Sequence, residues 1–236
     1  MEIIKGIEIK GKALWIKKEK ALIIGDSHIG YEEALAKQGF LVPRTMFLEM
    51  KKDLKELLKL KPTLIVINGD LKHEFGEISI QEWQEALEII DMIPKTSKII
   101  LIKGNHDKIL EPIARKREVE VRDFLILGEN VILHGHKMLI DAEIHSKKIK
   151  TIIIGHEHPA ISIQDNLKRE KFKCFLKGKW HGKNLLVMPS FFLGTEGSDV
   201  KTEKLFSPFL KEQNIGNFEV FIVGDKTYRF GKVKDI

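Results

Sequence analysis

The stretch Ala21-Leu22-Ile23-Ile24-Gly25-Asp26-Ser27-His28 decides the fold, because a short apolar run leads directly into a glycine and polar residues. A glycine and polar residues also lie at the ends of the apolar runs at 64–67, 99–102, 131–133 and 152–154. Each run is brief and rich in isoleucine and valine, which is typical of strands buried on both faces of a sheet. We therefore predict five buried strands, each ending in a polar cluster.

Helical patterns separate the first three runs. Residues 45–59 carry apolar side chains at helical spacing, and residues 79–91 open with Ser79 and Glu82 at the spacing of a capping box. Pro94 then ends the second helix. Strand, helix and strand in this order predict a parallel sheet with crossover helices.

Short extended stretches replace the helices from Val119 onward and predict a second sheet, mixed or antiparallel. Strands are expected at 171–176 and 185–188 around a basic turn, and at 218–223 and 227–230 around Gly224-Asp225. The stretch 189–217 is expected to be irregular, with one helical turn near 205–210. We predict a single domain, 1–236, with strand-end motifs in 25–158 and C-terminal strands and a substrate-side loop in 171–236.

The composition is that of a globular chain, with 236 residues, 43% hydrophobic residues, 31% charged residues and a formal net charge of +6. No apolar run reaches the roughly 18 residues of a membrane-spanning helix, and residues 1–10 lack the apolar stretch of a signal peptide. Cys174 is the only cysteine, which excludes an intrachain disulfide and a thiolate-rich zinc site. We expect a cytoplasmic protein that does not associate with membranes.

The polar clusters at the strand ends contain seven of the nine histidines, all except His145 and His181. Ligands of an open α/β sheet bind beyond the carboxyl ends of its strands, so these clusters are expected to converge. The clusters are Gly25-Asp26-Ser27-His28, Gly69-Asp70-Leu71-Lys72-His73, Gly104-Asn105-His106-Asp107, His134-Gly135-His136 and Gly155-His156-Glu157-His158.

Converging carboxylates, an amide oxygen and imidazoles predict a site for divalent cations such as manganese, iron, zinc or nickel. Calcium would prefer oxygen ligands throughout. The set offers more ligands than one tetrahedral ion needs, so two ions sharing a carboxylate are expected. Two ions roughly 3.5–4 Å apart typically serve the hydrolysis of phosphate esters, because they activate a bridging water as hydroxide and neutralise the phosphate oxygens.

Some clusters admit a purely structural interpretation. Asp26 with His28, or Gly69-Asp70, would each fit a strand-end turn or a helix cap. Gly-Asn-His-Asp and Gly-His-x-His are more specific, because turn chemistry does not explain imidazoles at buried strand ends. The five clusters in this order favour a metal site.

The motifs together resemble the signature of the calcineurin-like metallophosphoesterases. They are Asp-x-His at 26–28, Gly-Asp-x-x-His at 69–73, Gly-Asn-His-Asp at 104–107, a later strand-end histidine and Gly-His-x-His at 155–158. Size, spacing and the form Gly-Asp-Leu-Lys-His are most similar to the archaeal ICC-like phosphoesterases, which are described as related to the SbcD repair nuclease. The resemblance implies a four-layer α/β/β/α sandwich of two mixed sheets.

The resemblance also implies a role for each residue of the motifs. Two sets of three residues would each hold one ion and a seventh would bridge them: Asp26, His28 and His158; Asn105, His134 and His156; and Asp70. His106 would protonate or stabilise the leaving oxygen, and Asp107 would orient the His106 ring.

Other residues leave alternatives open. His136 could exchange with His134 as a ligand or approach the substrate phosphate, and His73 is expected to line the site. Glu157 is expected to be exposed or to form a loop ion pair, and His145 to be a surface or packing residue.

The lysine-rich stretch 168–183 could guide a nucleic-acid backbone. Solvated lysines that protect a sheet edge are the favoured interpretation, because acidic residues are interspersed and few aromatic side chains offer stacking. Phe191 and Phe192 could face the substrate or anchor their loop to the core.

The favoured function is that of a metal-dependent phosphoric ester hydrolase, a phosphodiesterase with two divalent ions, manganese ahead of iron, zinc or nickel. A phosphomonoesterase, a nucleotide phosphatase or a DNA or RNA nuclease would use the same site. A non-catalytic scaffold is disfavoured, because the ligands and the acid histidine are all present. Nucleic acids and nucleotides are among the phosphate esters considered as substrates, and the sequence predicts no oligomeric state.

Overall fold

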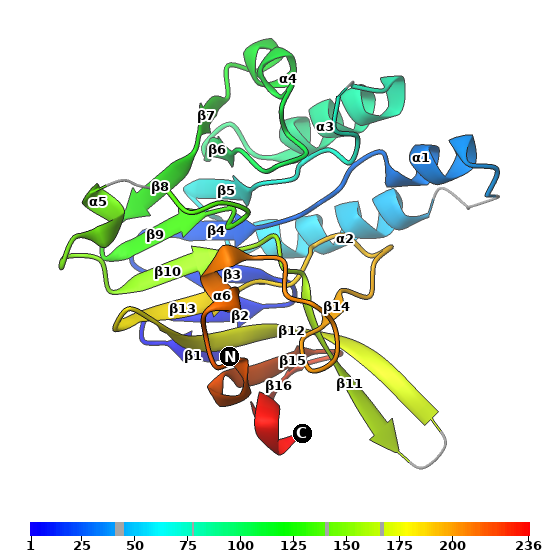
Figure 1. The fold of residues 1–236 in the computed structure, drawn as a ribbon. Coiled ribbons are helices and arrows are strands. Elements are labelled where there is room, and N and C mark those ends of the chain that lie inside the picture. Colours follow the sequence, from blue (N-terminus) through cyan, green and yellow to red (C-terminus); the bar gives the residue numbers. More distant parts are fainter. Residues whose placement is uncertain (41–44, 77, 140–141, 166–167) are drawn as a thin grey trace.

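The computed structural model describes residues 1–40, 45–76, 78–139, 142–165 and 168–236. Its first sheet has the strand order β1-β2-β3-β4-β5-β6-β7 (Figure 1). The bounds are β1 Glu2–Ile4, β2 Ile7–Lys10, β3 Ala13–Ile16, β4 Ala21–Ile24, β5 Leu64–Asn68, β6 Lys98–Ile102 and β7 Glu120–Arg122. Strands β4 to β7 pair in parallel, whereas β1 to β4 pair antiparallel. The predicted parallel pairing of the first three apolar runs is confirmed.

The second sheet has the order β14-β11-β12-β13-β10-β9-β8, with β15 beside β12 and β16 beside β15. The bounds are β8 Phe124–Leu127, β9 Asn130–Leu133, β10 Thr151–Ile154, β11 Pro159–Asp165, β12 Lys168–Trp180, β13 Lys183–Val187, β14 Ser198–Asp199, β15 Glu219–Val223 and β16 Thr227–Lys232. Strand β10 is parallel to β9 and β13, whereas β12 is antiparallel to β11, β13 and β15. The predicted mixed sheet is therefore confirmed.

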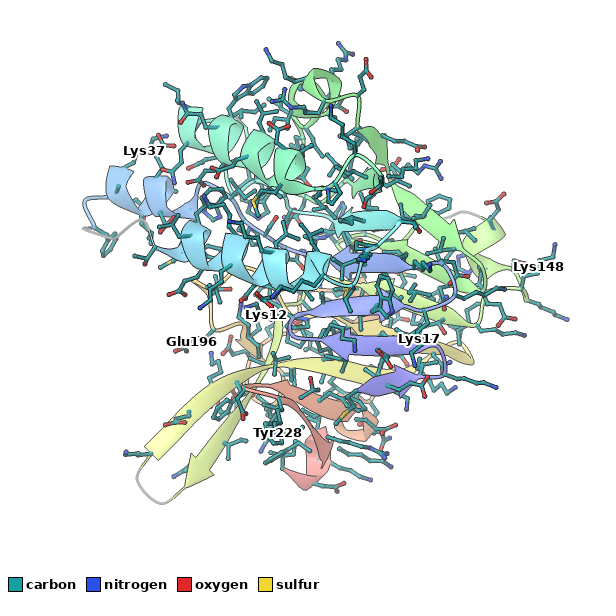
Figure 2. The ribbon with its side chains drawn as sticks, turned by 180° about the vertical axis from the view of Figure 1, so that it is seen from behind. Lys12, Lys17, Lys37, Lys148, Glu196 and Tyr228 are labelled. Atoms are coloured by element: carbon teal, nitrogen blue, oxygen red, sulfur yellow. The ribbon has the colours of Figure 1, made fainter. Side chains whose placement is uncertain are left out.

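Helices cover the outer face of the first sheet, where α2 and α3 lie side by side (Figure 2). The helices of this layer are α1 Tyr31–Lys37, α2 Met46–Leu58, α3 Ile80–Met92 and α4 Glu111–Lys116. The capping box of α3 forms as predicted, with Ser79 and Glu82 each bonding the other's main-chain amide. The turn after β2 reaches α2, because Lys12 Nζ lies 2.6 Å from Asp53 Oδ2 (Figure 2).

Alternate residues of each buried strand enter different hydrophobic cores. In β4, Leu22 and Ile24 pack with α2, α3 and α4, whereas Ile23 packs between the sheets. In β10, Ile153 joins that middle core, while Ile152 and Ile154 pack on the side of α5 Ala142–His145 and α6 Pro208–Lys211. Burial on both faces explains the continuous apolar runs. The result is the predicted four layers: helices, sheet, sheet and short helices.

Three details of the sequence interpretation change. Residues 120–122 form β7 in the first sheet, so the second sheet begins at Phe124, in β8, and not at Val119. The expected basic turn is strand instead, because β12 continues to Trp180 opposite β13 and the turn is confined to 181–182. Residues 2–16 form antiparallel strands that were not predicted.

The remaining C-terminal predictions agree with the structure. Strands β15 and β16 form the hairpin around Gly224-Asp225. Within 189–217, regular structure is limited to β14, α6 and a short 3₁₀ helix, Ile215–Asn217. In the part of the chain that the structure describes, no helix is both long and apolar enough to cross a membrane.

Candidate metal centre

The loops that follow β4 and β10 bring together Asp26, His28 and His158. His158 Nε2 lies 3.1 Å from Asp26 Oδ1 and 3.3 Å from His28 Nε2. Each residue offers one ligand atom, and these atoms all lie within 4.8 Å of one another. The three residues form the first ligand group.

A second ligand group, Asp70, His134 and His156, adjoins the first and meets the same 4.8 Å criterion. His134 Nε2 lies 3.3 Å from Asp70 Oδ2 and 3.1 Å from Asn105 Oδ1. The other ring nitrogen of His134, Nδ1, is 3.6 Å from Asp26 Oδ1. The two groups are therefore in contact, and all seven residues predicted as ligands lie together.

The carboxylates at this place are buried, with Asp26 0% and Asp70 2% exposed. Burial raises the pKa of each carboxyl group, but the neighbouring imidazoles, His158 for Asp26 and His134 for Asp70, outweigh it and lower both pKa values. Burial likewise lowers the pKa of His134, yet its hydrogen bond to Asp70 and the charges of both carboxylates raise that pKa to about 9. The site therefore concentrates negative charge that a cation would balance.

The imidazoles of His28 and His156 are neutral at neutral pH. Burial is the main cause, and it lowers the pKa of His28 to about 3 and that of His156 to about 4. A neutral imidazole keeps a lone pair on one ring nitrogen, which is the form that binds metal ions.

Left-handed backbone conformations are concentrated at the proposed ligands. The φ angles are 53° at Asp26, 42° at His28, 45° at Asp70, 65° at His156 and 47° at His158. Such a conformation costs on the order of 1–3 kcal/mol for a residue other than glycine. Strain of this kind clusters at functional sites, and here it directs the side chains out of the strand ends into one space.

Glycines make the close approach of the loops possible. A Cβ added at Gly104 would lie 2.0 Å from Asp70 Oδ1, and one added at Gly155 would lie 2.4 Å from Asp26 Oδ2. Both distances are far inside van der Waals contact, so only glycine leaves room for the carboxylates.

The donor set fits a divalent cation. Asp26 and Asp70 supply oxygen, and the imidazoles supply nitrogen, a mixture that suits manganese, iron, zinc and nickel. The facing nitrogens of His28 and His158 cannot both act as lone-pair acceptors toward each other, but both can bind the same cation. The adjoining groups therefore offer two places for a metal ion.

Asp107 does not orient the His106 ring, contrary to the sequence prediction. Its carboxylate accepts hydrogen bonds from the main-chain amides of Leu71, Lys72 and Gly104. Asp107 is 1% exposed, and a buried carboxylate needs hydrogen-bond donors, which these amides supply. Burial raises the pKa of Asp107 to about 6. Asp107 thus joins the loop after β5 to the loop after β6.

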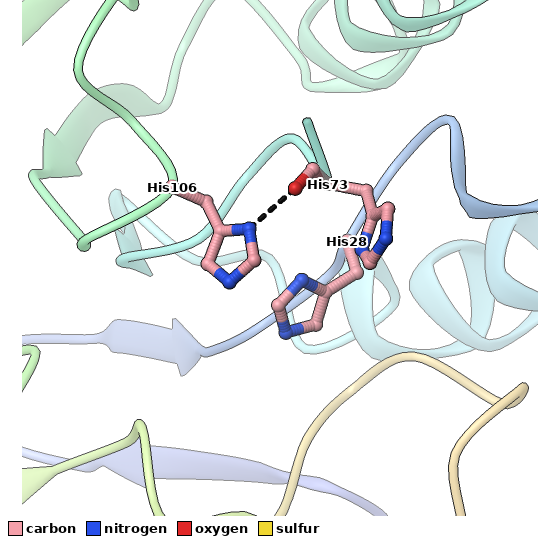
Figure 3. A group of neighbouring side chains, drawn as sticks. All are labelled: His28, His73 and His106. Atoms are coloured by element: carbon pink, nitrogen blue, oxygen red, sulfur yellow. Dashed lines mark hydrogen bonds between the residues drawn. The ribbon is translucent and has the colours of Figure 1, made fainter. Parts of the chain in front are cut away.

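The main-chain carbonyl of His73 orients His106 instead, because it bonds to His106 Nδ1 (Figure 3). The main-chain amide of His106 donates to Asp70 Oδ1 at 2.9 Å. His106 Nε2 lies 3.8 Å from Asp70 Oδ2, and the side chain is 14% exposed. The ring is therefore held at the edge of the second ligand group.

Glu157 is fully buried, so the expectation of an exposed residue or a loop ion pair is wrong. Its carboxylate accepts from the main-chain amides of Phe206 and Ser207 at distances between 2.8 and 3.2 Å. Glu157 stands between His156 and His158 in the chain. It therefore ties the ligand loop after β10 to the loop that precedes α6.

Lys173 has a supporting position that the sequence did not reveal. The sequence groups it with solvated lysines, but its ammonium donates to the carbonyls of Ser190 and Phe192, and burial lowers its pKa to about 7. Ser190 Oγ donates in turn to the carbonyl of Asp26 at 2.7 Å. No sequence signal distinguishes Lys173 from the exposed lysines of β12.

The remaining predicted positions fall around the site. Phe191 and Phe192 are 1% and 4% exposed, so both anchor their loop to the interior. The His136 ring centre lies 5.2 Å from that of His134, outside both ligand groups. His145 is exposed beside Trp180, as expected.

The chain is similar to several known proteins. The profile of the family Metallophos, calcineurin-like phosphoesterase, matches residues 20–215. The DNA polymerase II small subunit of Archaeoglobus fulgidus is 26% identical over an alignment of 181 positions, and the match covers 67% of this chain but only 37% of that relative. The structure of the nuclease MPE of Pseudomonas putida is similar at a TM-score of 0.66 and 17% identity, covering 93% of this chain and 92% of its own. YfcE, a phosphoesterase from E. coli, has a TM-score of 0.41 and 13% identity, with 87% and 88% covered. Since the family profile matches most of its length, the chain belongs to the calcineurin-like phosphoesterase family.

Proposed function

We propose that the chain hydrolyses phosphate esters with two divalent metal ions. The first ion would be held by Asp26, His28 and His158, the second by Asn105, His134 and His156, and Asp70 would bridge them. The contact between the two ligand groups carries this proposal, because His134 reaches Asp70 at 3.3 Å and Asp26 at 3.6 Å. Ligand groups this close would place two ions within reach of one phosphate.

The bound ions would polarise the phosphate oxygens and lower the pKa of a water molecule. We propose manganese as the native metal, with iron, zinc and nickel as alternatives, because the carboxylate and amide oxygens temper the preference of imidazole for softer ions. The protein supplies the buried carboxylates and the fixed imidazole orientations that keep the ions in place.

His106 would donate a proton to the leaving oxygen. Its Nδ1 is engaged by the His73 carbonyl, so Nε2 is the nitrogen available for proton transfer. Asp107 would contribute by fixing the loop on which His106 stands, since it bonds to the amide of Gly104 at 3.0 Å.

We propose a phosphodiester, of the kind found in nucleic acids, as the substrate class. A pocket of about 370 Å³ beside the centre is lined by Asn105 and by three lysines, of which Lys103 pairs with Glu111 at 2.6 Å, Lys137 pairs with Asp123 at 3.7 Å, and Lys108 is exposed. Lysines there would bind phosphates next to the one being cleaved. The nuclease MPE and the DNA polymerase subunit among the similar proteins favour the same class.

We also propose that residues 1–236 act as one domain. The middle core joins both halves, because Ile23 and Ile100 of the first sheet pack in the same cluster as Ile132 and Ile153 of the second. Separation of the halves would expose this core to water.

A substrate panel tests the proposed function. Chelated protein should lose hydrolysis of a bis-aryl phosphate and regain it with manganese, and a mono-aryl phosphate should be cleaved more slowly. Asp70→Asn should abolish the activity, whereas the exposed Asp235→Asn should not change it. Undiminished hydrolysis by fully chelated protein would refute the metal dependence, and faster cleavage of the mono-aryl phosphate would make the enzyme a phosphomonoesterase.

A further inference from the structure

Three histidines form a cluster at the side of the metal centre where α1 and α3 begin. His28, His73 and His106 come from the loops after β4, β5 and β6, and their rings surround a common space (Figure 3). The ring centres are 5.7 Å apart for His28 and His73, 5.1 Å for His28 and His106, and 5.6 Å for His73 and His106. One ring nitrogen of each lies within 4.8 Å of the others. The two ligand groups described above do not include His73 or His106.

The size of this triangle matches a zinc ion. With Zn–N bonds of about 2.0–2.1 Å and tetrahedral angles, the centres of three coordinated imidazoles lie about 5.2 Å apart. The observed separations of 5.1–5.7 Å are close to that value. Small rotations of the rings would therefore complete the coordination, and the fourth position would remain for water.

Two rings of the cluster each have a nitrogen that lacks a hydrogen-bond partner in the part of the chain that the structure describes. Nδ1 of His28 and Nδ1 of His73 are buried and have no hydrogen-bond partner among the described residues. His106 Nδ1 is bonded to the His73 carbonyl, which leaves the lone pair of Nε2 for a ligand. Buried polar atoms without partners are uncommon, and a cation would satisfy all three rings at once.

From these observations we propose that His28, His73 and His106 form a third cation site, selective for zinc-like ions, whose occupation inhibits the enzyme. An all-imidazole site suits zinc, nickel and copper, and it disfavours manganese and magnesium, which prefer oxygen ligands. Aromatic rings adjoin the cluster, with Phe75 centred 3.6 Å from His106 and Tyr31 centred 4.8 Å from His73. This apolar surround limits competition from water.

The inhibitory effect rests on the proposed function, in which His106 Nε2 carries the proton for the leaving oxygen. A nitrogen that binds a cation cannot carry that proton, so the third ion would block the step. His28 can serve two sites through different ring nitrogens, because Nε2 faces His158 and Nδ1 is buried without a hydrogen-bond partner among the described residues. When both sites are filled, the His28 ring releases its N–H proton to the solvent.

Metal counting on the full chain tests the site independently of activity. Manganese-loaded protein is dialysed against excess zinc, and the total metal bound per chain is measured. We expect three ions for the unsubstituted chain, two for His73→Gln and three for the matched control His145→Gln. His145 lies on α5, which precedes the start of β10, whereas the metal centre lies beyond its end. Retention of two ions by His73→Gln would also show that this variant is folded.

Hydrolysis of the bis-aryl phosphate provides the second measurement. Zinc should lower the hydrolysis rate of the unsubstituted chain and of His145→Gln, each compared with its own rate in manganese alone. In His73→Gln the zinc concentration for half-inhibition should rise at least about tenfold, because one ligand is lost. The proposal of a third site would be refuted by any of three results. These are two ions bound to the unsubstituted chain, three ions bound to His73→Gln, or equal inhibition of both proteins by zinc. Absence of any hydrolysis with manganese would refute the proposed function, while the metal count would still decide the site.

Discussion

Gly104→Ala should disable the metal centre through a single added carbon. The new Cβ would lie 2.0 Å from Asp70 Oδ1 and 2.3 Å from the main-chain nitrogen of Asp70. A carbon–oxygen contact needs about 3.4 Å or more, so the carboxylate has to retreat by more than about 1 Å. The main-chain nitrogen cannot rotate away, which means that the whole turn after β5 must shift. Gly104 itself does not have a positive φ angle, so the effect is steric and acts on Asp70.

A displacement of about 1 Å in a group that positions reacting atoms typically costs on the order of 10²-fold in rate. We therefore expect kcat/KM for a bis-aryl phosphate with manganese to fall by at least that factor, and manganese binding to weaken. Overpacking should also lower the free energy of unfolding of the metal-free chain by about 1–3 kcal/mol.

Gly76→Ala is the matched control, because no atom of the described residues lies within 4 Å of a Cβ added at Gly76. The assays are steady-state kinetics, metal content after equilibrium dialysis and urea unfolding. A folded Gly104→Ala variant that binds two manganese ions and keeps kcat/KM within about threefold of the unsubstituted chain would refute the reasoning.

Three further predictions concern the acid histidine, the buried imidazole and the buried glutamate. His106→Ala should lower kcat by roughly 10²–10⁴-fold while the two ions stay bound, and metal loss measured in this variant would contradict the proposed role. For His28, whose pKa is lowered to about 3, the unfolded chain binds the proton more tightly, so the stability of chelated protein should fall with pH below about 6.5. The contribution of His28 to this fall in the free energy of unfolding is about 2 kcal/mol at pH 5, measured by urea titration. The free energy of unfolding of His28→Asn should therefore depend less on pH than that of the unsubstituted chain. Glu157→Ala leaves the buried amide of Ser207 and the partly buried amide of Phe206 without their acceptor, so it should destabilise the chain by roughly 2–4 kcal/mol in the same assay, with Glu157→Gln milder. Equal stability of Glu157→Ala and the unsubstituted chain would show that this loop is not held by the carboxylate.

The buried strands and the ligand candidates could be recognised in the sequence because their signals are local. A run such as Ile152-Ile153-Ile154 is apolar at every position since both faces of β10 are buried. The polar residues directly after it must emerge at the strand end, whatever the rest of the chain does. For the same reason the capping box of α3 was predictable, since Ser79 and Glu82 are three positions apart.

Supporting contacts depended on the tertiary structure, because their partners lie in other loops. Nothing near Asp107 in the chain indicates that it accepts from the amide of Leu71, 36 positions away. Likewise, the sequence predicted that Glu157 would be exposed or in a loop ion pair, but in the structure it accepts a hydrogen bond from the amide of Ser207, 50 positions along the chain. Lys173 is chemically identical to the exposed lysines of β12, and only its position under the loop of Ser190 makes it structural.

The sequence by itself thus determined which residue types stand at the ends of the buried strands, since adjacency along the chain defines that. Only the tertiary structure decided which of them face one another. His28 and His158 are separated by 130 positions, yet their ring nitrogens lie 3.3 Å apart because β4 and β10 end at the same rim. The triangle of His28, His73 and His106 arises in the same way, from three loops whose spacing is set by the pairing of β4, β5 and β6. Distances between loops follow from sheet register and packing, and these are properties of the whole fold.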